Sequence, residues 1–319
     1  MISLRYHIVS IAAVFLALAV GVVLGSGAIS GRLLSGLSSD RTELGRQVSD
    51  LQEQRNALRA QLADADSFAL AVGPRVVRDA LRGRSVVLLS TADAGPADRD
   101  ALAVLLGQAG AVLTGEVQLT EEFTDTARSA QLSELSARLL PAGVRLPTTA
   151  DSATLAGGLL GSVLLLDPGT GQPQASPEET VAALAGFGDG GFVRTGQEIK
   201  PAQLAVVLTG GAAPGEGSPG DSTVGHAGGG DRAGIVARFA TQLDRSGAGV
   251  VLAGRPGSAD GVGPIGVVRA DTAATALLST VDDVSTSAGR VATVLALAEQ
   301  AQGRAGRYGS AGNAQAMAP

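Results

Sequence analysis

The sequence predicts an α/β protein: an N-terminal transmembrane helix and a coiled coil, followed by a three-layer domain with a mainly parallel sheet. An uncharged stretch lies near the start, a leucine heptad follows it, and short apolar strands then alternate with helical segments. Strands that are apolar along their whole length are typical of a sheet covered by helices on both faces. We divide the chain into an anchor (1–30), a coiled coil (31–72), the α/β domain (73–302) and a disordered tail (303–319).

The anchor is predicted from residues 8–24, IVSIAAVFLALAVGVVL, which contain neither charge nor proline. At 1.5 Å per residue, roughly 17 residues cover most of a hydrocarbon core of about 30 Å, and residues 25–29 can supply the remainder. Arg5 precedes the stretch and no acidic residue does, and positive charge is retained on the cytoplasmic side. We therefore expect an uncleaved membrane helix with a cytoplasmic N-terminus and the bulk of the chain in an extracytoplasmic, periplasm-like space.

Two other interpretations of this stretch stay open. Small residues at 26–28 offer a place for signal-peptide cleavage, although the apolar region of a signal peptide is usually shorter, about 7–15 residues. A buried core helix is the third interpretation, and it would rarely be so uniformly apolar beside a basic terminus.

Composition excludes several classes of function. The 319 residues carry 24 basic and 30 acidic side chains, a net charge of −6, so the chain shows no electrostatic footprint for nucleic acid. It has no cysteine, which excludes disulfides and thiol chemistry. Aromatic residues make up 3 %, too few for base-stacking platforms or for the aromatic girdles of an outer-membrane barrel.

The coiled coil is predicted from a heptad that runs through residues 33–66. Its seam consists of Leu34, Leu37, Arg41, Leu44, Val48, Leu51, Arg55, Leu58 and Leu62. Leucine at d, with valine and two arginines at a, fits a parallel dimer in which the charged a residues fix the register at some cost in stability. We expect a homodimer; the alternatives are a helix packed on its own domain and a helix of an envelope or division protein docked on the seam.

The domain elements follow from apolar runs and their flanking signals. Gly73 and Pro74 should end the long helix, and a short helix should follow at 75–81. The predicted strands are 85–90, 111–119, 191–195, 204–209 and 249–253. The predicted helices are 97–109, 121–140, 155–166, 177–187, 231–245 and 290–300, and Ser176 with Glu179 forms a capping box. Residues 302–319 offer little apolar surface to bury and are expected to be disordered.

Catalytic candidates are few, and we expect no enzyme. The histidines are His7, beside the anchor, and His226, within a run of glycines at 210–230 that cannot hold a catalytic imidazole still. Glu121 with Glu122, and Asp282 with Asp283, are paired carboxylates that could bind a hard cation or activate water, although solvated or capping roles are favoured.

A ligand crevice is suggested where two strands end, at Gly210 and at Arg255, because open α/β sheets bind ligands at the carboxyl ends of their strands. No G-x-G-x-x-G or P-loop pattern joins a strand to a helix, and GFGDGG at 186–191 leaves a helix instead of entering one. We therefore expect the glycines to shape turns and predict no bound cofactor.

Several segments match one family in register. They are MISLRYHIVSIAAVFLALAVGVVLGS at 1–26, LTEEF at 119–123, LLPAG at 139–143, VVLTGG at 206–211, LAGR at 252–255, VRAD at 268–271, STVDD at 279–283 and YGSAG at 308–312. Through these segments the chain resembles the mycobacterial copper transport protein B (MctB) family over nearly its whole length.

The resemblance implies an actinobacterial envelope protein with a role in copper efflux or copper resistance, described as pore-forming in the outer membrane, with copper as the transported ion. The same family is linked to cell separation, so the alternative is a dimeric coiled-coil scaffold that regulates a septal peptidoglycan hydrolase. The family supplies no catalytic residue.

The residues themselves do not predict a copper site or a pore. Cu(I) prefers thiolate and thioether ligands and Cu(II) prefers imidazole, but the predicted extracytoplasmic part offers only His226 and Met317. We expect no tight copper site within one subunit, and the ligands of any metal stay unknown. The strands SVVLLS, LAVVLT and GVVLAG lack the alternation of a membrane barrel, which favours an anchored scaffold.

Overall fold

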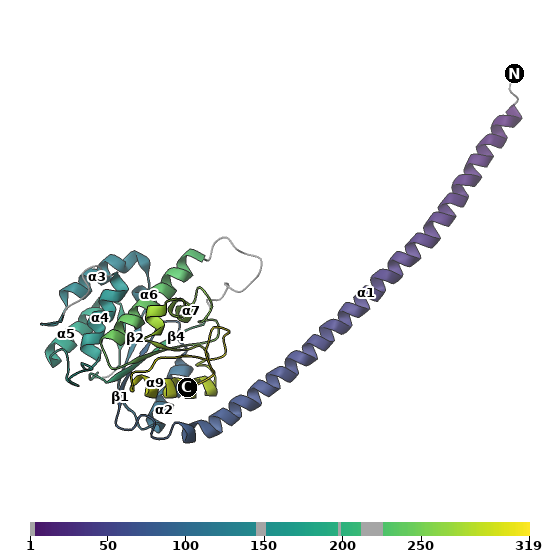
Figure 1. Ribbon diagram of the computed structural model, residues 1–319. Helices are drawn as coiled ribbons and strands as arrows, with labels where there is room; N and C mark the ends of the chain where they lie inside the picture. The colour runs from purple at the N-terminus through teal and green to yellow at the C-terminus, as the bar shows by residue number, and fades with distance from the viewer. Residues whose placement is uncertain (1–3, 145–150, 197–198, 212–225) are drawn as a thin grey trace. The chain divides into compact units, whose positions relative to one another are not determined.

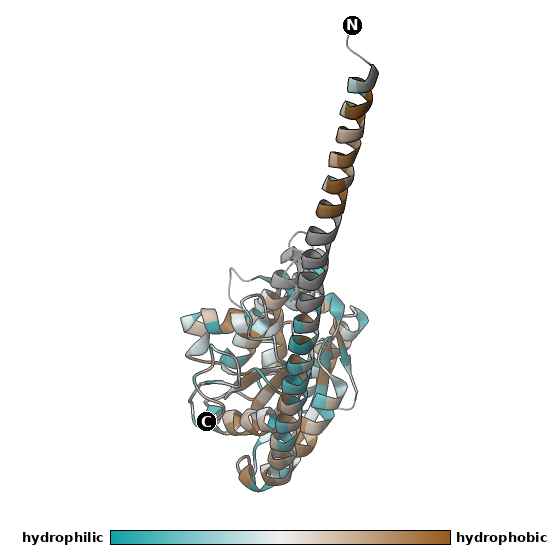
Figure 2. Ribbon diagram, turned by 90° about the vertical axis from the view of Figure 1, so that its right-hand side faces the viewer, coloured by the Kyte–Doolittle hydropathy of each residue, from teal (hydrophilic) through white to brown (hydrophobic). Residues whose placement is uncertain are grey.

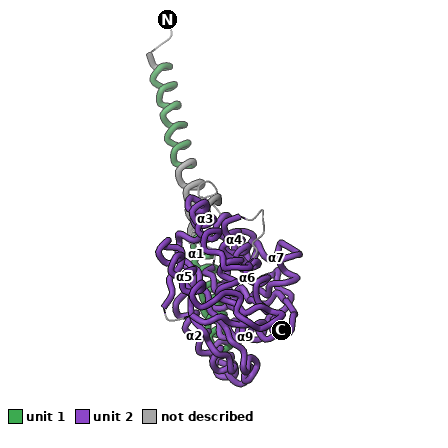
Figure 3. Tube along the Cα trace, turned by 90° about the vertical axis from the view of Figure 1, so that its left-hand side faces the viewer, with its two compact units in different colours: residues 1–65 green, residues 66–319 purple. Residues whose placement is uncertain are grey.

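The computed structural model describes residues 4–144, 151–196, 199–211 and 226–319, and their side chains except those of 4–5, 25–40, 42 and 226–230. The chain forms two compact units, Met1–Ala65 and Asp66–Pro319 (Figure 3). We describe each unit by itself.

Unit 1 consists of the greater part of helix α1 (Leu4–Val76). Within it, Tyr6–Leu24 has a mean hydropathy of 2.6 and is mostly brown in Figure 2. Its side chains are exposed. This segment is long and apolar enough to cross a membrane, which supports membrane anchoring.

The predicted seam lies further along the same helix. Every seam side chain that the structure describes, from Arg41 to Leu62, is exposed, whereas the side chains of Leu34 and Leu37 lie outside the described residues. A single chain does not test pairing between helices, so the coiled coil stays a prediction.

Unit 2 is a three-layer α/β domain, as predicted (Figure 1). Its described residues form a seven-stranded sheet in the order β3-β2-β1-β4-β5-β6-β7. The strands are β1 (Ser85–Ser90), β2 (Val112–Leu119), β3 (Val193–Thr195), β4 (Leu204–Thr209), β5 (Val250–Gly254), β6 (Ser279–Val281) and β7 (Arg307–Tyr308). Each neighbouring pair is parallel except β2 with β3, so the prediction of a mainly parallel sheet is confirmed.

Alternate residues of each central strand face different helical layers. In β1, Val86 and Leu88 belong to the core that contains α2 (Pro96–Gln108) and α9 (Ser287–Gln300), whereas Val87 and Leu89 belong to the opposite core. The opposite layer contains α3 (Ser129–Arg138), α4 (Ser152–Leu164), α5 (Pro177–Asp189), α6 (His226–Arg245) and α7 (Pro264–Ala270). The smaller elements are η1 (Glu121–Phe123), η2 (Thr126–Arg128) and α8 (Thr272–Thr275).

The predicted helix break at Gly73 and Pro74 is wrong. Helix α1 continues to Val76, and the residues after it form turns instead of the short helix predicted at 75–81. Packing explains the difference: the Asp66 carboxylate accepts hydrogen bonds from the backbone N–H and, at 3.1 Å, the hydroxyl of Ser287 at the start of α9. Contact with α9 stabilises the last turns of α1 despite the proline.

Other helix boundaries differ at polar turns. The helix predicted at 121–140 is two short 3₁₀ turns followed by α3, because the Asp125 side chain accepts from Ala127 N at 2.9 Å and starts a new turn. Helix α6 begins at His226, five residues before its predicted start at 231. The capping box of Ser176 and Glu179 at the start of α5 is confirmed.

The expectation of a disordered tail is also wrong. Residues 307–308 form strand β7 beside β6, and Tyr308 is only 4 % exposed. A further bridge joins Tyr308 to Ala316, and Gly309 N donates to Ala316 O at 3.0 Å. The order of this segment depends on polar partners from distant parts of the sequence, which are described below.

A buried carboxyl group lies between α6 and β5. Asp244 accepts a hydrogen bond from Val250 N at 2.8 Å and is 8 % exposed. Burial, partly opposed by this hydrogen bond and by Arg245, raises the pKa of Asp244 to about 7. The folded state therefore binds a proton on Asp244 at pH values where the unfolded chain does not.

Asp244→Asn should change how stability depends on pH. The stabilising contribution of protonated Asp244 is fully present below the unfolded pKa of about 4 and is lost as pH rises to about 7. Asparagine keeps an oxygen acceptor for Val250 N and carries no charge, so the variant should gain more in Tm at about pH 8 than at about pH 5. Thermal unfolding of the full chain in detergent measures this; an equal change at both pH values would contradict the assignment.

Candidate functional site at the carboxyl edge of the sheet

The carboxyl ends of the parallel strands gather at one edge of the sheet. The strand order reverses between β1 and β4, since β1 continues to β2 on one side and β4 to β5 on the other. Open α/β sheets bind ligands at such a switch point. Gly210 follows β4 and Arg255 follows β5, so the structure places both predicted crevice residues at this edge.

The ends of β1 and β4 are tied directly to each other. Thr91 N donates to Leu208 O at 2.9 Å, and the Thr91 hydroxyl contacts both Leu208 O at 3.2 Å and the Asp93 carboxylate. That carboxylate lies so close to Gly210 that a Cβ at this position would collide with it. Gly210 therefore allows a close approach of the loops that follow β1 and β4, whereas its predicted role in shaping a turn stays a prediction.

Arg255 is paired within the crevice. Its Nε donates to the Asp98 carboxylate at 2.5 Å, where Asp98 lies in the first turn of α2. The Asp98 side chain is 9 % exposed and that of Arg255 is 43 % exposed. The positive charge that an anionic ligand would need is thus already matched by a carboxylate, and a ligand would have to compete with this ion pair.

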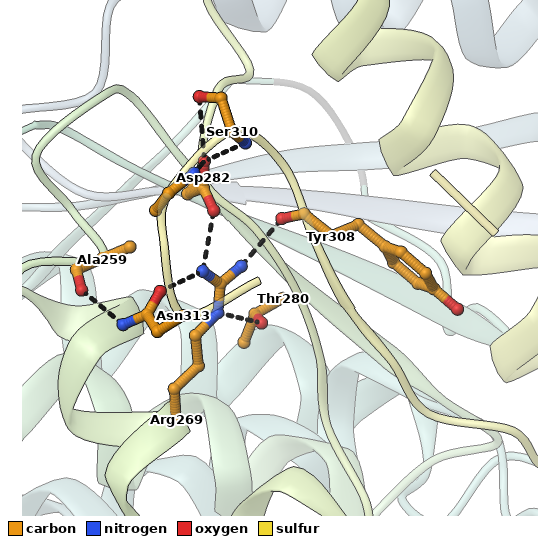
Figure 4. A network of polar contacts seen from close by, with 8 residues as sticks. Ala259, Arg269, Thr280, Asp282, Tyr308, Ser310 and Asn313 are labelled. Atoms are coloured by element: carbon orange, nitrogen blue, oxygen red, sulfur yellow. Dashed lines mark hydrogen bonds and ion pairs between the residues drawn. The ribbon is translucent and has the colours of Figure 1, made fainter. Parts of the chain in front are cut away.

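A second ion pair lies deeper at the same edge. Arg269 on α7 donates to Asp282 at 2.7 Å, and both side chains are 2 % exposed (Figure 4). Arg269 also donates to the Asn313 side chain and to Tyr308 O, each at 2.7 Å, and to the Thr280 hydroxyl at 3.0 Å. The guanidinium group therefore joins α7, β6 and the C-terminal segment.

The carboxylate of the pair holds the same segment. Asp282 Oδ1 accepts from Ser310 N at 2.8 Å and from Ala311 N at 3.1 Å, while the Asn313 side chain donates to Ala259 O at 2.9 Å. Breaking a buried, hydrogen-bonded pair by removing one partner costs about 3–5 kcal/mol, because the other charge stays buried. Asp282 thus has a structural role: of the two roles that we favoured for it, the solvated one is wrong, whereas its acceptance of two successive backbone N–H groups is of the capping kind.

Its neighbour Asp283 is buried as well, at 4 % exposure, so a solvated role is wrong for this residue too. Two causes raise the pKa of Asp283 to about 6: its burial, which is the larger, and the nearby negative charge of Asp282. Its Oδ1 has no hydrogen-bond partner among the described residues. The other predicted pair, Glu121 and Glu122, is exposed at the start of η1, as expected for solvated carboxylates.

Potential copper ligands are not brought together in the described part of the chain. His7 is exposed on α1, Met317 is 56 % exposed, and His226 begins α6 with a side chain outside the described residues. No group of three or more histidine, aspartate or glutamate side chains among the described residues is arranged to hold a metal ion.

Comparison with known proteins identifies the family. A family model described as "Copper transport outer membrane protein, MctB" matches residues 1–319. The chain belongs to the MctB family. Its relatives include proteins named "Copper transporter MctB" from Mycobacterium tuberculosis (strain ATCC 25618 / H37Rv) and Mycobacterium bovis, each 41 % identical over 322 residues that cover 99 % of both chains. The Mycobacterium leprae relative of the same name is 38 % identical and covers 97 % of this chain and 96 % of its own length.

Membership confirms the resemblance drawn from the sequence. The MctB family name supports a copper-related role in the cell envelope and designates a transporter, not an enzyme. The apolar segment Tyr6–Leu24 agrees with association of the chain with a membrane.

Asp282→Ala should destabilise the domain and release its C-terminal segment. We expect a loss of about 3–5 kcal/mol, because Arg269 stays buried without its carboxylate, and residues 307–316 should become sensitive to protease. Chemical denaturation and limited proteolysis with mass spectrometry measure the two effects.

The matched control is Asp100→Ala, which removes an exposed partner of Arg99 at 2.8 Å and should cost about 0–1 kcal/mol. Equal losses in the two variants would show that the buried pair contributes no more than a surface pair.

Proposed function

We propose that this chain is a single-pass, membrane-anchored envelope protein of copper handling, whose α/β domain lies outside the cytoplasm. The observation that carries the proposal is the apolar, exposed segment Tyr6–Leu24, with a mean hydropathy of 2.6, in a chain that also folds a separate α/β unit. An isolated helix of this composition satisfies its backbone hydrogen bonds internally and places its apolar side chains favourably in lipid.

Two features support an uncleaved anchor in the proposed orientation. The backbone of residues 25–40 is helical, so the small residues at 26–28 continue the anchor helix. Arg5 lies on the N-terminal side of the apolar segment, and positive residues favour the cytoplasmic side.

The available donors support an indirect copper role. The chain has no cysteine, two histidines and two methionines, and His7 belongs to the anchor segment. His226 and Met317 would therefore need further soft ligands from a partner or a second subunit to bind Cu(I) tightly. We propose a non-enzymatic protein that supports copper efflux or resistance without a tight copper site of its own.

The exposed seam on α1 supports self-association. Leu44, Leu51 and Leu58 recur at heptad spacing and are each at least 60 % exposed in the single chain. In a parallel pair of helices these leucines would be buried as knobs in holes, and Arg41 and Arg55 would limit the stability of the homodimer. The same arginines would favour exchange of one copy for an acidic helix of an envelope or division protein.

The test of the envelope role uses a strain that lacks this protein and receives the full chain with alkaline phosphatase at its C-terminus. The phosphatase, which needs disulfides, should be active because the domain is exported. Copper tolerance should be restored equally by the wild-type chain and by His226→Ala, because the proposed role in copper tolerance does not require copper binding by His226.

Each failure has a different meaning. An inactive phosphatase would contradict the orientation, and loss of copper tolerance with His226→Ala would show a direct copper site. Normal copper tolerance with chained, unseparated cells in the deletion strain would instead favour the scaffold that regulates a septal hydrolase.

Changing Leu44 and Leu51 together to alanine should convert a dimer of the full chain into a monomer. Each lost leucine should cost about 2–5 kcal/mol where packing is tight. Analytical ultracentrifugation in detergent measures the mass, and circular dichroism should show that the α/β domain remains folded.

Leu70→Ala is the matched control, since Leu70 is 64 % exposed on the same helix but lies outside the a and d positions. A wild-type chain that is monomeric at high micromolar concentration, or a double variant that stays dimeric, would exclude the seam as the dimerisation element.

A further inference from the structure

An apolar cleft lies at the opposite end of the sheet order from the Arg269 network. It is formed by α5, the segment that precedes α5, Thr195 at the end of β3 and residues 199–201 before β4, and its volume is about 480 Å³. Ligand pockets usually enclose about 300–1,000 Å³. The cleft is therefore large enough for a small ligand.

Helix α5 presents apolar residues to this cleft as well as to the core. Ala183 and Phe187 are buried in the core, whereas Val181 and Leu184 line the cleft. Val181 is 66 % exposed. A surface helix normally carries polar residues on the side away from its core, so this second apolar side indicates a binding surface.

The opposite wall is held in place by the sheet. Strand β2 has an irregularity at Thr114, and the next residue, Gly115, lies against Ile199, where a Cβ would come within 2.8 Å of the Ile199 side chain. Lys200 N donates to Thr114 O at 3.1 Å, and Ala202 N donates to Leu164 O at 2.8 Å. Residues 199–202, which form this wall, are thus anchored to β2 and to the end of α4.

The lining disfavours a polypeptide and favours a hydrocarbon chain. Pro173, Pro177 and Pro201 line the cleft and have no backbone N–H with which to pair an extended peptide. A hydrocarbon has no polar backbone to satisfy, and it gains from leaving water.

Three polar side chains, those of Thr180, Thr195 and Lys200, interrupt this apolar lining. Lys200, the only lysine of the chain, is the one charged residue among the described residues that line the cleft. Thr180 also lines it, and its buried hydroxyl has no hydrogen-bond partner among the described residues. A cation beside an apolar wall suits an amphiphile whose head is an anion.

We propose that this cleft binds a single acyl chain with an anionic head group, the chain packed on Val181 and Leu184 and the head beside Lys200. The proposal rests on the proposed function in one respect, because export on a membrane anchor brings the domain close to lipid. A free fatty acid and an anionic lysophospholipid, each with one acyl chain, share this chemistry.

The test uses the full chain in phosphatidylcholine nanodiscs, exposed to hexadecanoic acid that carries a photoreactive diazirine. Labelling should occur in peptides that contain residues 173–185 or 199–201, as mapped by mass spectrometry. A second arm with diazirine-labelled lysophosphatidylglycerol distinguishes the sources, since stronger labelling by one of the two probes identifies the free acid or the lysolipid as the ligand.

Matched variants locate the site. Val181→Arg places a charge in the cleft and should reduce labelling at least about tenfold. Val104→Arg makes the same change at a valine that is 63 % exposed on α2, outside the cleft, and should leave labelling unchanged. Lys200→Gln should reduce labelling about two- to fivefold, and Lys200→Arg should restore it.

Three results would overturn the proposal: equal labelling of the two valine variants, labelling confined to Tyr6–Leu24, or capture of a polypeptide instead of lipid by a benzophenone placed at position 181. All three are independent of the phosphatase fusion, so they would leave the proposed envelope location intact.

Discussion

The structure depends on the need to cover both faces of its central strands. All six residues of β4 and nearly all of β1 are buried, and burial of each valine or leucine is worth about 1.5–3 kcal/mol relative to exposure. This gain requires a helical layer on each face, supplied by α2 and α9 on one side and by α4 and α6 on the other. Parallel pairing then brings the polar loop residues to one edge, where they pair with each other.

Local signals were enough to predict the elements that make up this core. The apolar runs SVVLLS and LAVVLT coincide with β1 and β4, and the start of α5 follows from its capping box, because each signal lies within the element itself. The C-terminal segment gave the opposite signal. Its composition is that of a disordered tail, but Tyr308 O pairs with Arg269, 39 residues earlier, and Ser310 N with Asp282, 28 residues earlier.

The candidate sites show the same limit. Gly210 and Arg255 could be placed at the crevice because each follows a strand. Their contacts could not be predicted: Asp93 lies against Gly210 and Asp98 accepts from Arg255, and these aspartates come from a loop and a helix more than a hundred residues earlier. The apolar cleft had no sequence signal either, because Val181 belongs to a helix with an ordinary core face and Ile199 to an irregular segment. Only the fold shows that these two residues line the same cleft.

The solitary lysine has a practical consequence. Lys200 is exposed, and apart from the amino terminus it is the one primary amine of the polypeptide. Amine-directed reagents such as succinimidyl esters will therefore attach a dye, a spin label or biotin at two places, the amino terminus and the lining of the apolar cleft, without any engineered residue. Since the chain also lacks cysteine, a thiol introduced elsewhere provides a second, chemically distinct attachment point for distance measurements.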